Sequence, residues 1–186
     1  AGYSWGVAEE VGKNIRILES FGISGIRNLN YYFKVKDKMD FEKLNLITRE
    51  NKEKKLQYCP IIAGINFLDQ ARSLENINEI RFEKVGYPLL FLPFISRASE
   101  IIGKKIQLDI DNRVFFLNYN LSIYSNSINN GVIEIGNKVL IKFIENEDSF
   151  KESEWKELYK LSENTFVEEN ESLKNIGAGA GLTDND

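Results

Sequence analysis

The sequence contains no histidine and only one cysteine, Cys59, among its 186 residues. Serine and cysteine nucleophiles of the triad type need an imidazole to accept their proton, so the sequence excludes that class of enzyme. Zinc sites built from histidine and cysteine are excluded because their ligands are missing. A lone cysteine also cannot form a disulfide within the chain, which is typical of proteins in a reducing compartment.

Long apolar runs and an excess of positive charge are missing as well. The longest apolar stretch, residues 87–95, is far shorter than the roughly 20 residues that cross a bilayer. The net charge is −4, whereas sequence-independent nucleic-acid binding depends on clustered lysine and arginine. We therefore expect a cytoplasmic protein that binds neither membranes nor nucleic acid, and we expect no metal and no cofactor.

Local patterns predict both helices and strands. Ser4 is suited to cap a helix over residues 5–20, because apolar residues then recur on one helical face. Similar spacing predicts helices over residues 25–36, 60–72, 88–103 and 149–164. Between residues 104 and 145 the apolar residues alternate, and three dipeptides with turn chemistry divide this stretch into antiparallel strands. These dipeptides are Asp111-Asn112, Asn130-Gly131 and Gly136-Asn137.

The length and these patterns predict the domain organisation. A chain of this size buries roughly 70% of its unfolded surface, which is enough for one stable domain. We predict a single α+β domain over residues 1–165, in which helices pack on one face of an antiparallel β-meander. An extended glycine-rich tail over residues 166–186 follows it. The absence of an initiator methionine leads us to expect a short native segment before Ala1.

The two ends of the chain carry its most specific motifs, GYSWGVAEE at residues 2–10 and GAGAGLTDND at residues 177–186. Together with CPIIAGINFLDQ at 59–70 and VGYPLLFLPFISRA at 85–98, these ends resemble a family of uncharacterised, mainly proteobacterial proteins known only as a domain of unknown function. The resemblance implies a bacterial origin and an N-terminus somewhat upstream of Ala1. It implies no reaction.

Glu9 and Glu10 are the candidate catalytic residues. They face different sides of the predicted first helix, so only one of them can point into a cleft together with Trp5. Such a carboxylate could act as a general acid or base. Stabilisation of the helix N-terminus by capping and by the helix dipole explains both residues adequately.

The C-terminal motif supplies the other candidate site. Its glycines could expose backbone N–H groups to an anion, but the motif lacks the Lys-Ser/Thr of a phosphate loop. A disordered tail and a tail that docks on its own subunit, a neighbour or another protein are the alternatives. The predicted binding residues are Trp5, Gly177, Gly179, Gly181, Asp184 and Asp186.

Cys59 and the tyrosines offer a weaker signal. Cys59 precedes a proline at a predicted helix N-terminus, a place that favours a reactive thiol. No histidine exists to serve as its base, so a buried and inert thiol is the simpler interpretation. Five tyrosines could line an aromatic pocket or pack in the core. They are Tyr3, Tyr31, Tyr32, Tyr58 and Tyr87.

Two functions remain open at this stage. The first, which we favour, is a non-catalytic binding or assembly protein that forms a homodimer and uses its C-terminal tail as a contact element. The second is a small-molecule enzyme or accessory subunit that uses Glu9 or Glu10, with the tail as a lid. A small-molecule ligand is compatible with both functions.

Overall fold

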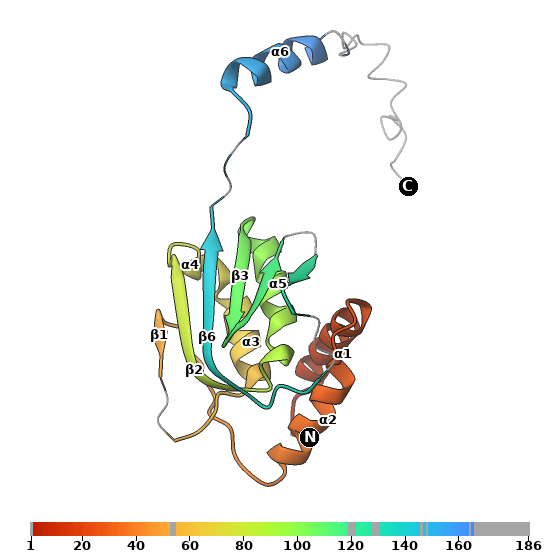
Figure 1. Ribbon diagram of the computed structural model, residues 1–186, viewed down its shortest axis with the longest axis vertical. Coiled ribbons are helices and arrows are strands. Elements are labelled where there is room, and N and C mark those ends of the chain that lie inside the picture. Colours follow the sequence, from red (N-terminus) through yellow and green to blue (C-terminus); the bar gives the residue numbers. More distant parts are fainter. Residues whose placement is uncertain are drawn as a thin grey trace, which may run out of the picture. The chain divides into compact units, whose positions relative to one another are not determined.

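The computed structural model describes residues 2–52, 55–118, 122–127, 131–145, 147, 149–163 and 165. The chain divides into two units, residues 1–146 and 147–186. The helices of the first unit are α1 (Trp5–Ser20), α2 (Gly25–Lys36), α3 (Pro60–Asp69), α4 (Ala71–Leu74), η1 (Pro88–Leu90) and α5 (Leu92–Ile102). Its strands are β1 (Glu50–Asn51), β2 (Glu79–Gly86), β3 (Lys105–Ile110), β4 (Arg113–Leu117), β5 (Ile123–Ser125) and β6 (Ile135–Ile144). Figure 1 labels most of these elements.

The strands form one mixed sheet in the order β1-β2-β6-β3-β4-β5. β1 runs parallel to β2, and the other neighbouring strands are antiparallel. β6 is central, because Val139 pairs with Phe82 of β2 and with Ile110 of β3. The predicted α+β class is confirmed.

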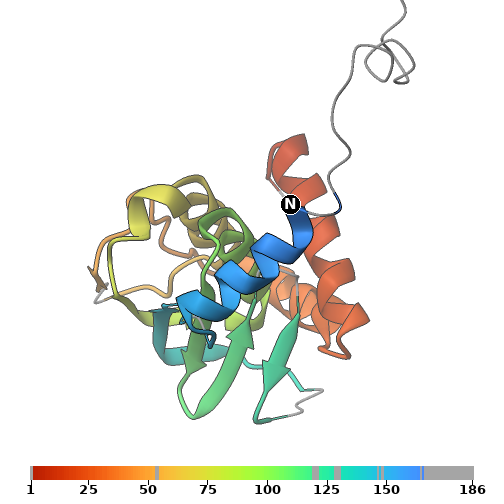
Figure 2. The ribbon, with the colours of Figure 1, turned by 90° about the horizontal axis from the view of Figure 1, so that it is seen from above.

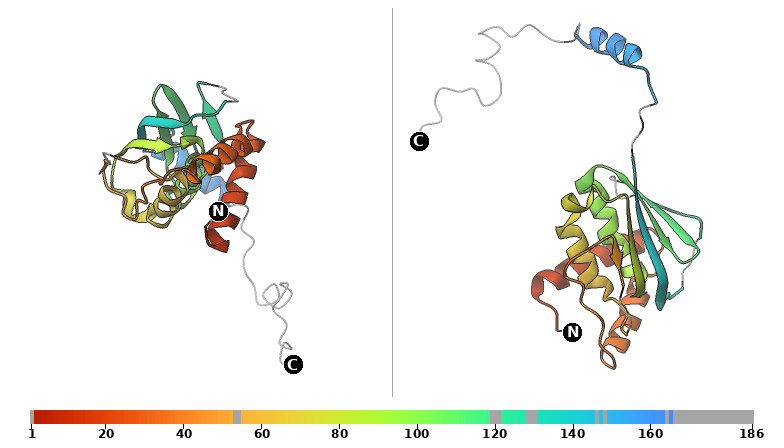
Figure 3. Two further views of the ribbon diagram at one scale, coloured as in Figure 1. Left: turned by 90° about the horizontal axis from the view of Figure 1, so that it is seen from below. Right: turned by 90° about the vertical axis from the view of Figure 1, so that its left-hand side faces the viewer.

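The helices of the first unit cover one face of this sheet. In β3 the side chains of Ile106, Leu108 and Ile110 are buried, whereas the alternate residues are more accessible. α3 packs on the buried face, where the ring of Phe67 stacks on Phe143 of β6 at 6.5 Å between centroids. The right-hand view of Figure 3 shows α3 and α5 on the same side of the sheet.

The first two helices form as the sequence predicts. The Ser4 hydroxyl accepts a hydrogen bond from the Val7 N–H and caps α1. α1 and α2 then pack against each other (Figure 2), and Gly25 permits their close approach. A Cβ atom at Gly25 would lie 2.9 Å from the Leu18 Cβ.

The prediction of a hairpin at Gly136-Asn137 is wrong, because β6 runs without interruption through both residues. Gly136 is buried opposite Val85, and a Cβ there would lie 2.9 Å from Val139 Cγ2. This glycine therefore serves close packing rather than a turn. The turn predicted at Asp111 does form, with a φ of 52° at that residue.

The second unit contains α6 (Glu152–Glu163), which begins three residues after the predicted start at Ser149. At its first turn the Lys151 N–H donates to Glu154 Oε2 at 2.6 Å, and the Phe150 and Trp155 rings lie 5.8 Å apart. The predicted division at residues 165 and 166 stays a prediction, and the tail lies outside the described residues. Within the described part of the chain, none of the helices has the length and apolar character to span a membrane.

Candidate functional site

A cavity of about 430 Å³ opens where α1 begins, α2 ends and α3 begins. The segment before α1 and the loop after α2 complete its wall, so residues from five parts of the chain meet there. Its titratable lining residues are Tyr3, Tyr32, Lys36, Asp40, Lys43 and Cys59. Val7, Phe41 and Ile62 give it an apolar side. The cavity is therefore amphipathic.

Two phenols and a thiol meet in the wall of this cavity. The hydroxyl oxygens of Tyr3 and Tyr32 lie 2.5 Å apart. The Cys59 Sγ lies 3.1 Å from the Tyr32 hydroxyl and 3.3 Å from the Tyr3 hydroxyl. Tyr32 and Cys59 are almost fully buried, at 0% and 3% exposed, whereas Tyr3 is half-buried. The three polar groups satisfy one another, as buried polar groups in proteins generally do.

The start of α3 fixes Cys59 in this arrangement. Pro60 occupies the first turn, where its missing N–H costs no hydrogen bond. The Cys59 Sγ accepts the Ile62 N–H at 3.5 Å and so caps the helix. The Cys59 N–H donates in turn to the Glu42 carbonyl at 2.8 Å. Backbone hydrogen bonds therefore fix both the side chain and the main chain of Cys59.

Aromatic packing fixes the Tyr32 ring. Phe41 lies 5.0 Å from it, and Tyr87 meets it edge-on at 5.9 Å. Tyr87 is buried and has a φ of 45°, in the left-handed region that non-glycine residues rarely adopt. Its N–H donates to the Glu134 carbonyl at 2.8 Å, which holds this strained backbone in place. Backbone strain of this kind tends to cluster at functional sites.

The electrostatics of the cavity keep both phenols protonated. Burial first, and then the electrostatic interaction with Cys59, raise the pKa of Tyr32 far above its usual value of 10.0. The same two causes, in the same order, raise the pKa of Tyr3. Both side chains therefore remain O–H donors at neutral pH. The Lys36 Nζ lies 5.0 Å from the centre of the Tyr3 ring, within reach of a cation–π contact.

The candidate residues of the first helix lie elsewhere. Trp5 is 81% exposed and is not among the residues that line the cavity. Glu9 is exposed and pairs with Lys13 at 3.0 Å. Glu10 pairs with Arg97 of α5 and with Lys13, and the hydrogen bond from Arg97 lowers the pKa of the Glu10 carboxyl. The structure thus places Glu10 in an ion-pair network between two helices.

The C-terminal candidates, Gly177, Gly179, Gly181, Asp184 and Asp186, lie outside the described residues. Their proposed role stays a prediction. In the residues that the structure does describe, no cluster of three or more Cys, Asp or Glu could hold a metal ion.

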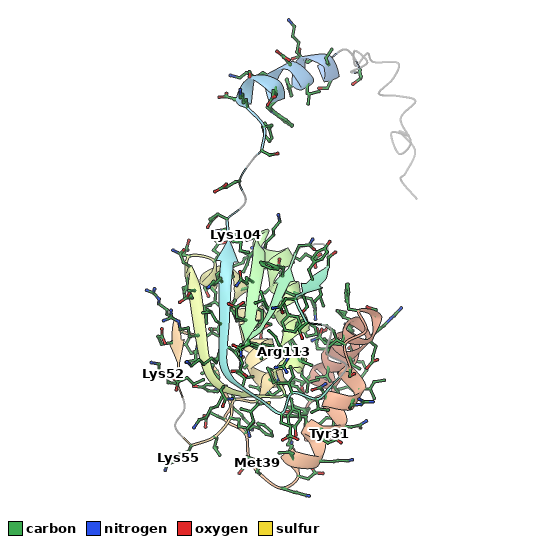
Figure 4. All side chains as sticks on the ribbon, in the orientation of Figure 1. Tyr31, Met39, Lys52, Lys55, Lys104 and Arg113 are labelled. Carbon is green, nitrogen blue, oxygen red and sulfur yellow. The ribbon has the colours of Figure 1, made fainter. Side chains whose placement is uncertain are left out.

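The tyrosines are the part of the sequence analysis that leads to the cavity. Tyr3 and Tyr32 line the cavity, and the ring of Tyr87 packs edge-on against the ring of Tyr32. Tyr58 is buried beside Phe82, and Tyr31 is 44% exposed on α2 (Figure 4). The contributions of the loop after α2 were missed. That loop has no periodic apolar pattern, so the sequence carries no signal for where its side chains lie.

Comparisons with known proteins add a partial match. The model of a family described as "Protein of unknown function (DUF3726)" matches residues 1–58. This match includes Tyr3 and Tyr32 and ends one residue before Cys59. No curated protein and no solved structure matches the chain. The N-terminal third of the chain is therefore similar to a family whose function is unknown.

Proposed function

We propose that the protein is a non-catalytic binding protein, and that its first unit holds a small organic molecule in the cavity beside Cys59. The observation that carries this proposal is the convergence of Tyr3, Tyr32 and Cys59, from three separate segments, on a cavity of about 430 Å³. Cavities of roughly 300–1,000 Å³ with an apolar lining and a few polar groups are the usual form of small-molecule sites. The volume and lining of this cavity fit that class.

The side chains of the site favour binding over acid–base catalysis. Because burial raises the pKa of Tyr3 and of Tyr32, both phenols serve as hydrogen-bond donors and are poor bases at neutral pH. A carboxylate enzyme that uses Glu10 has less support, because Arg97 lowers the pKa of Glu10 and binds its side chain. An acid catalyst would need the opposite shift.

Titration of the full chain with benzamide, followed in amide ¹H–¹⁵N NMR spectra, tests the proposal. Benzamide is a neutral probe with an apolar ring and one hydrogen-bonding group, which matches the amphipathic lining. Saturable shifts centred on the amides of Val7, Lys36, Cys59 and Ile62 are the expected result. The absence of saturable shifts at those amides at millimolar benzamide would overturn the proposal.

A pair of substitutions on neighbouring positions of α1 controls for non-specific binding. Val7 lines the cavity and Ala8 is exposed outside it. Val7→Trp should fill the cavity and abolish the saturable shifts, whereas Ala8→Trp should leave them unchanged. Equal effects of the two substitutions would contradict the assignment of the site.

The sequence further leads us to propose that the protein is a cytoplasmic homodimer whose C-terminal tail makes the contact. This part rests on the specific GAGAGLTDND motif at residues 177–186. The molar mass of the full chain, measured by light scattering, should be that of a dimer. Removal of residues 177–186 should change that mass, and an unchanged mass would remove the reason for giving the tail this role.

A further inference from the structure

The balance of charge around the cavity is positive. Lys36 and Lys43 line it, against one carboxylate, Asp40. Lys43 is exposed, and among the described residues no carboxylate lies within 4.0 Å of its Nζ. An ammonium group in this position can interact with the anionic group of a ligand at a small desolvation cost.

The phenols of the cavity carry no negative charge that would oppose an anion. Tyr3 and Tyr32 stay protonated, and their hydroxyls are hydrogen-bonded to each other and to the Cys59 sulfur. The Lys36 ammonium is held near the N-terminal segment, since a Cβ at Gly2 would lie 3.9 Å from its Nζ. Ammonium donors match the oxygen atoms of a carboxylate.

The apolar side of the cavity defines the rest of the ligand. Val7, Phe41 and Ile62 come from α1, from the loop after α2 and from α3. Their side chains suit a ring or a short hydrocarbon and offer it no hydrogen bonds. A ligand that satisfies both sides carries an anionic group at one end and an apolar body at the other.

We infer that the ligand of the cavity is a small organic carboxylate, with its anion beside Lys43 and Lys36 and its apolar body against Val7, Phe41 and Ile62. This inference rests on the proposed function, because it names the chemical class that the same cavity accepts. It also requires affinity to fall as salt concentration rises, since exposed charges are screened.

Three probes of nearly the same shape test the inference. Benzoate is an anion, benzamide is neutral and benzylamine is a cation at neutral pH. NMR titrations of the full chain should give benzoate a Kd about three- to fivefold lower than benzamide, the size expected for an exposed ion pair. Benzylamine should bind more weakly than benzamide. Equal affinities, or tightest binding of benzylamine through Asp40, would overturn the inference.

Two lysine substitutions separate the local charge from the net charge of the protein. Lys38 is exposed and does not line the cavity, so Lys38→Met is the matched control for Lys43→Met. Only Lys43→Met should reduce the preference for benzoate over benzamide. If benzamide binds and benzoate has no advantage, the carboxylate inference fails and the proposed function stands. If none of the three probes binds, both fail.

Discussion

The hydroxyl of Tyr3 lies 2.5 Å from the hydroxyl of Tyr32, although 29 positions separate the two residues in the chain. Both groups lie within 3.3 Å of the Cys59 sulfur, a further 27 positions along. One small polar cluster therefore ties the segment before α1 to α2 and to the start of α3. The same cluster forms the polar wall of the cavity, so the fold of the N-terminal region and the candidate site depend on the same contacts.

Tyr32→Phe should destabilise the protein by about 0.5–1.5 kcal/mol, the usual cost of losing a buried hydrogen bond. The substitution removes the contacts of the Tyr32 hydroxyl with Tyr3 and Cys59 and keeps the packing of the ring. Urea denaturation measures the effect. The matched control is Tyr31→Phe on the same helix, where the half-exposed side chain predicts a change within about 0.5 kcal/mol. Equal changes for the two variants would show that the Tyr32 hydroxyl contributes nothing.

Stability should fall at alkaline pH in a way that depends on Tyr32. Its pKa is raised in the folded state, so the unfolded chain releases the phenol proton first, near the usual pKa of 10.0. The stabilisation is complete below that pH and is lost as the pH rises above it. Above pH 10 the wild-type free energy of unfolding should decrease more steeply than that of Tyr32→Phe, by up to about 1.4 kcal/mol per pH unit. Parallel profiles from pH 8 to 11 would contradict this prediction.

Glu10→Gln should reduce stability at neutral pH by about 0.5–1 kcal/mol, since it breaks a half-exposed pair with Arg97. The pair lowers the pKa of Glu10 below 4.5. Its contribution is therefore present above pH 4.5 and is lost as the pH falls through the folded-state pKa. Denaturation at pH 7 and at pH 3 should show the gap between wild type and Glu10→Gln closing at the lower pH.

Glu9→Gln provides the control for this pair, because Glu9 is exposed and forms a surface ion pair with Lys13. Its effect should be smaller than that of Glu10→Gln at pH 7. A larger effect of Glu9→Gln would argue that Glu10 does not join α1 to α5.

Two glycine substitutions should have opposite effects on stability. Gly64→Ala in α3 would place a Cβ 2.3 Å from Phe94 Cδ2 of α5, and such overpacking costs about 1–3 kcal/mol. Gly12→Ala in α1 meets nothing within 4 Å, so the higher helix propensity of alanine should stabilise the protein by about 0.5–1 kcal/mol. Thermal denaturation of both variants checks the close approach of α3 and α5. A stabilising Gly64→Ala would contradict it.

Local signals in the sequence predict the limits of an element correctly where residues within that element determine where it begins and ends. The cap at Ser4 and the apolar residues that recur on one helical face predict α1 with the limits that the structure shows. Gly136 shows the opposite case, because the sequence pattern predicts a turn there and the glycine in fact lets β6 pack closely against Pro88 and Ile110. That role depends on residues distant in the chain, which a local pattern does not reveal.

The candidate site is harder to predict from the sequence, because it too depends on residues that are distant in the chain. Tyr3, Tyr32 and Cys59 each look ordinary in their own segment, and only the packing of three segments brings them together. Lys43 lies in a loop without periodicity, so nothing in the sequence directs its side chain toward the cavity. Specific motifs drew attention instead to Trp5, which the structure leaves exposed.

The most direct test of the central claim is a measurement of intermolecular NOEs between benzamide and the full-length protein in solution. The account predicts NOEs from the ring protons of benzamide to the methyl groups of Val7 and Ile62, both of which line the cavity. The NOEs to the Ile62 methyl groups should disappear in Val7→Trp. NOEs confined to methyl groups on the opposite face of the sheet, such as those of Leu140, or no NOEs at saturating benzamide, would contradict the account.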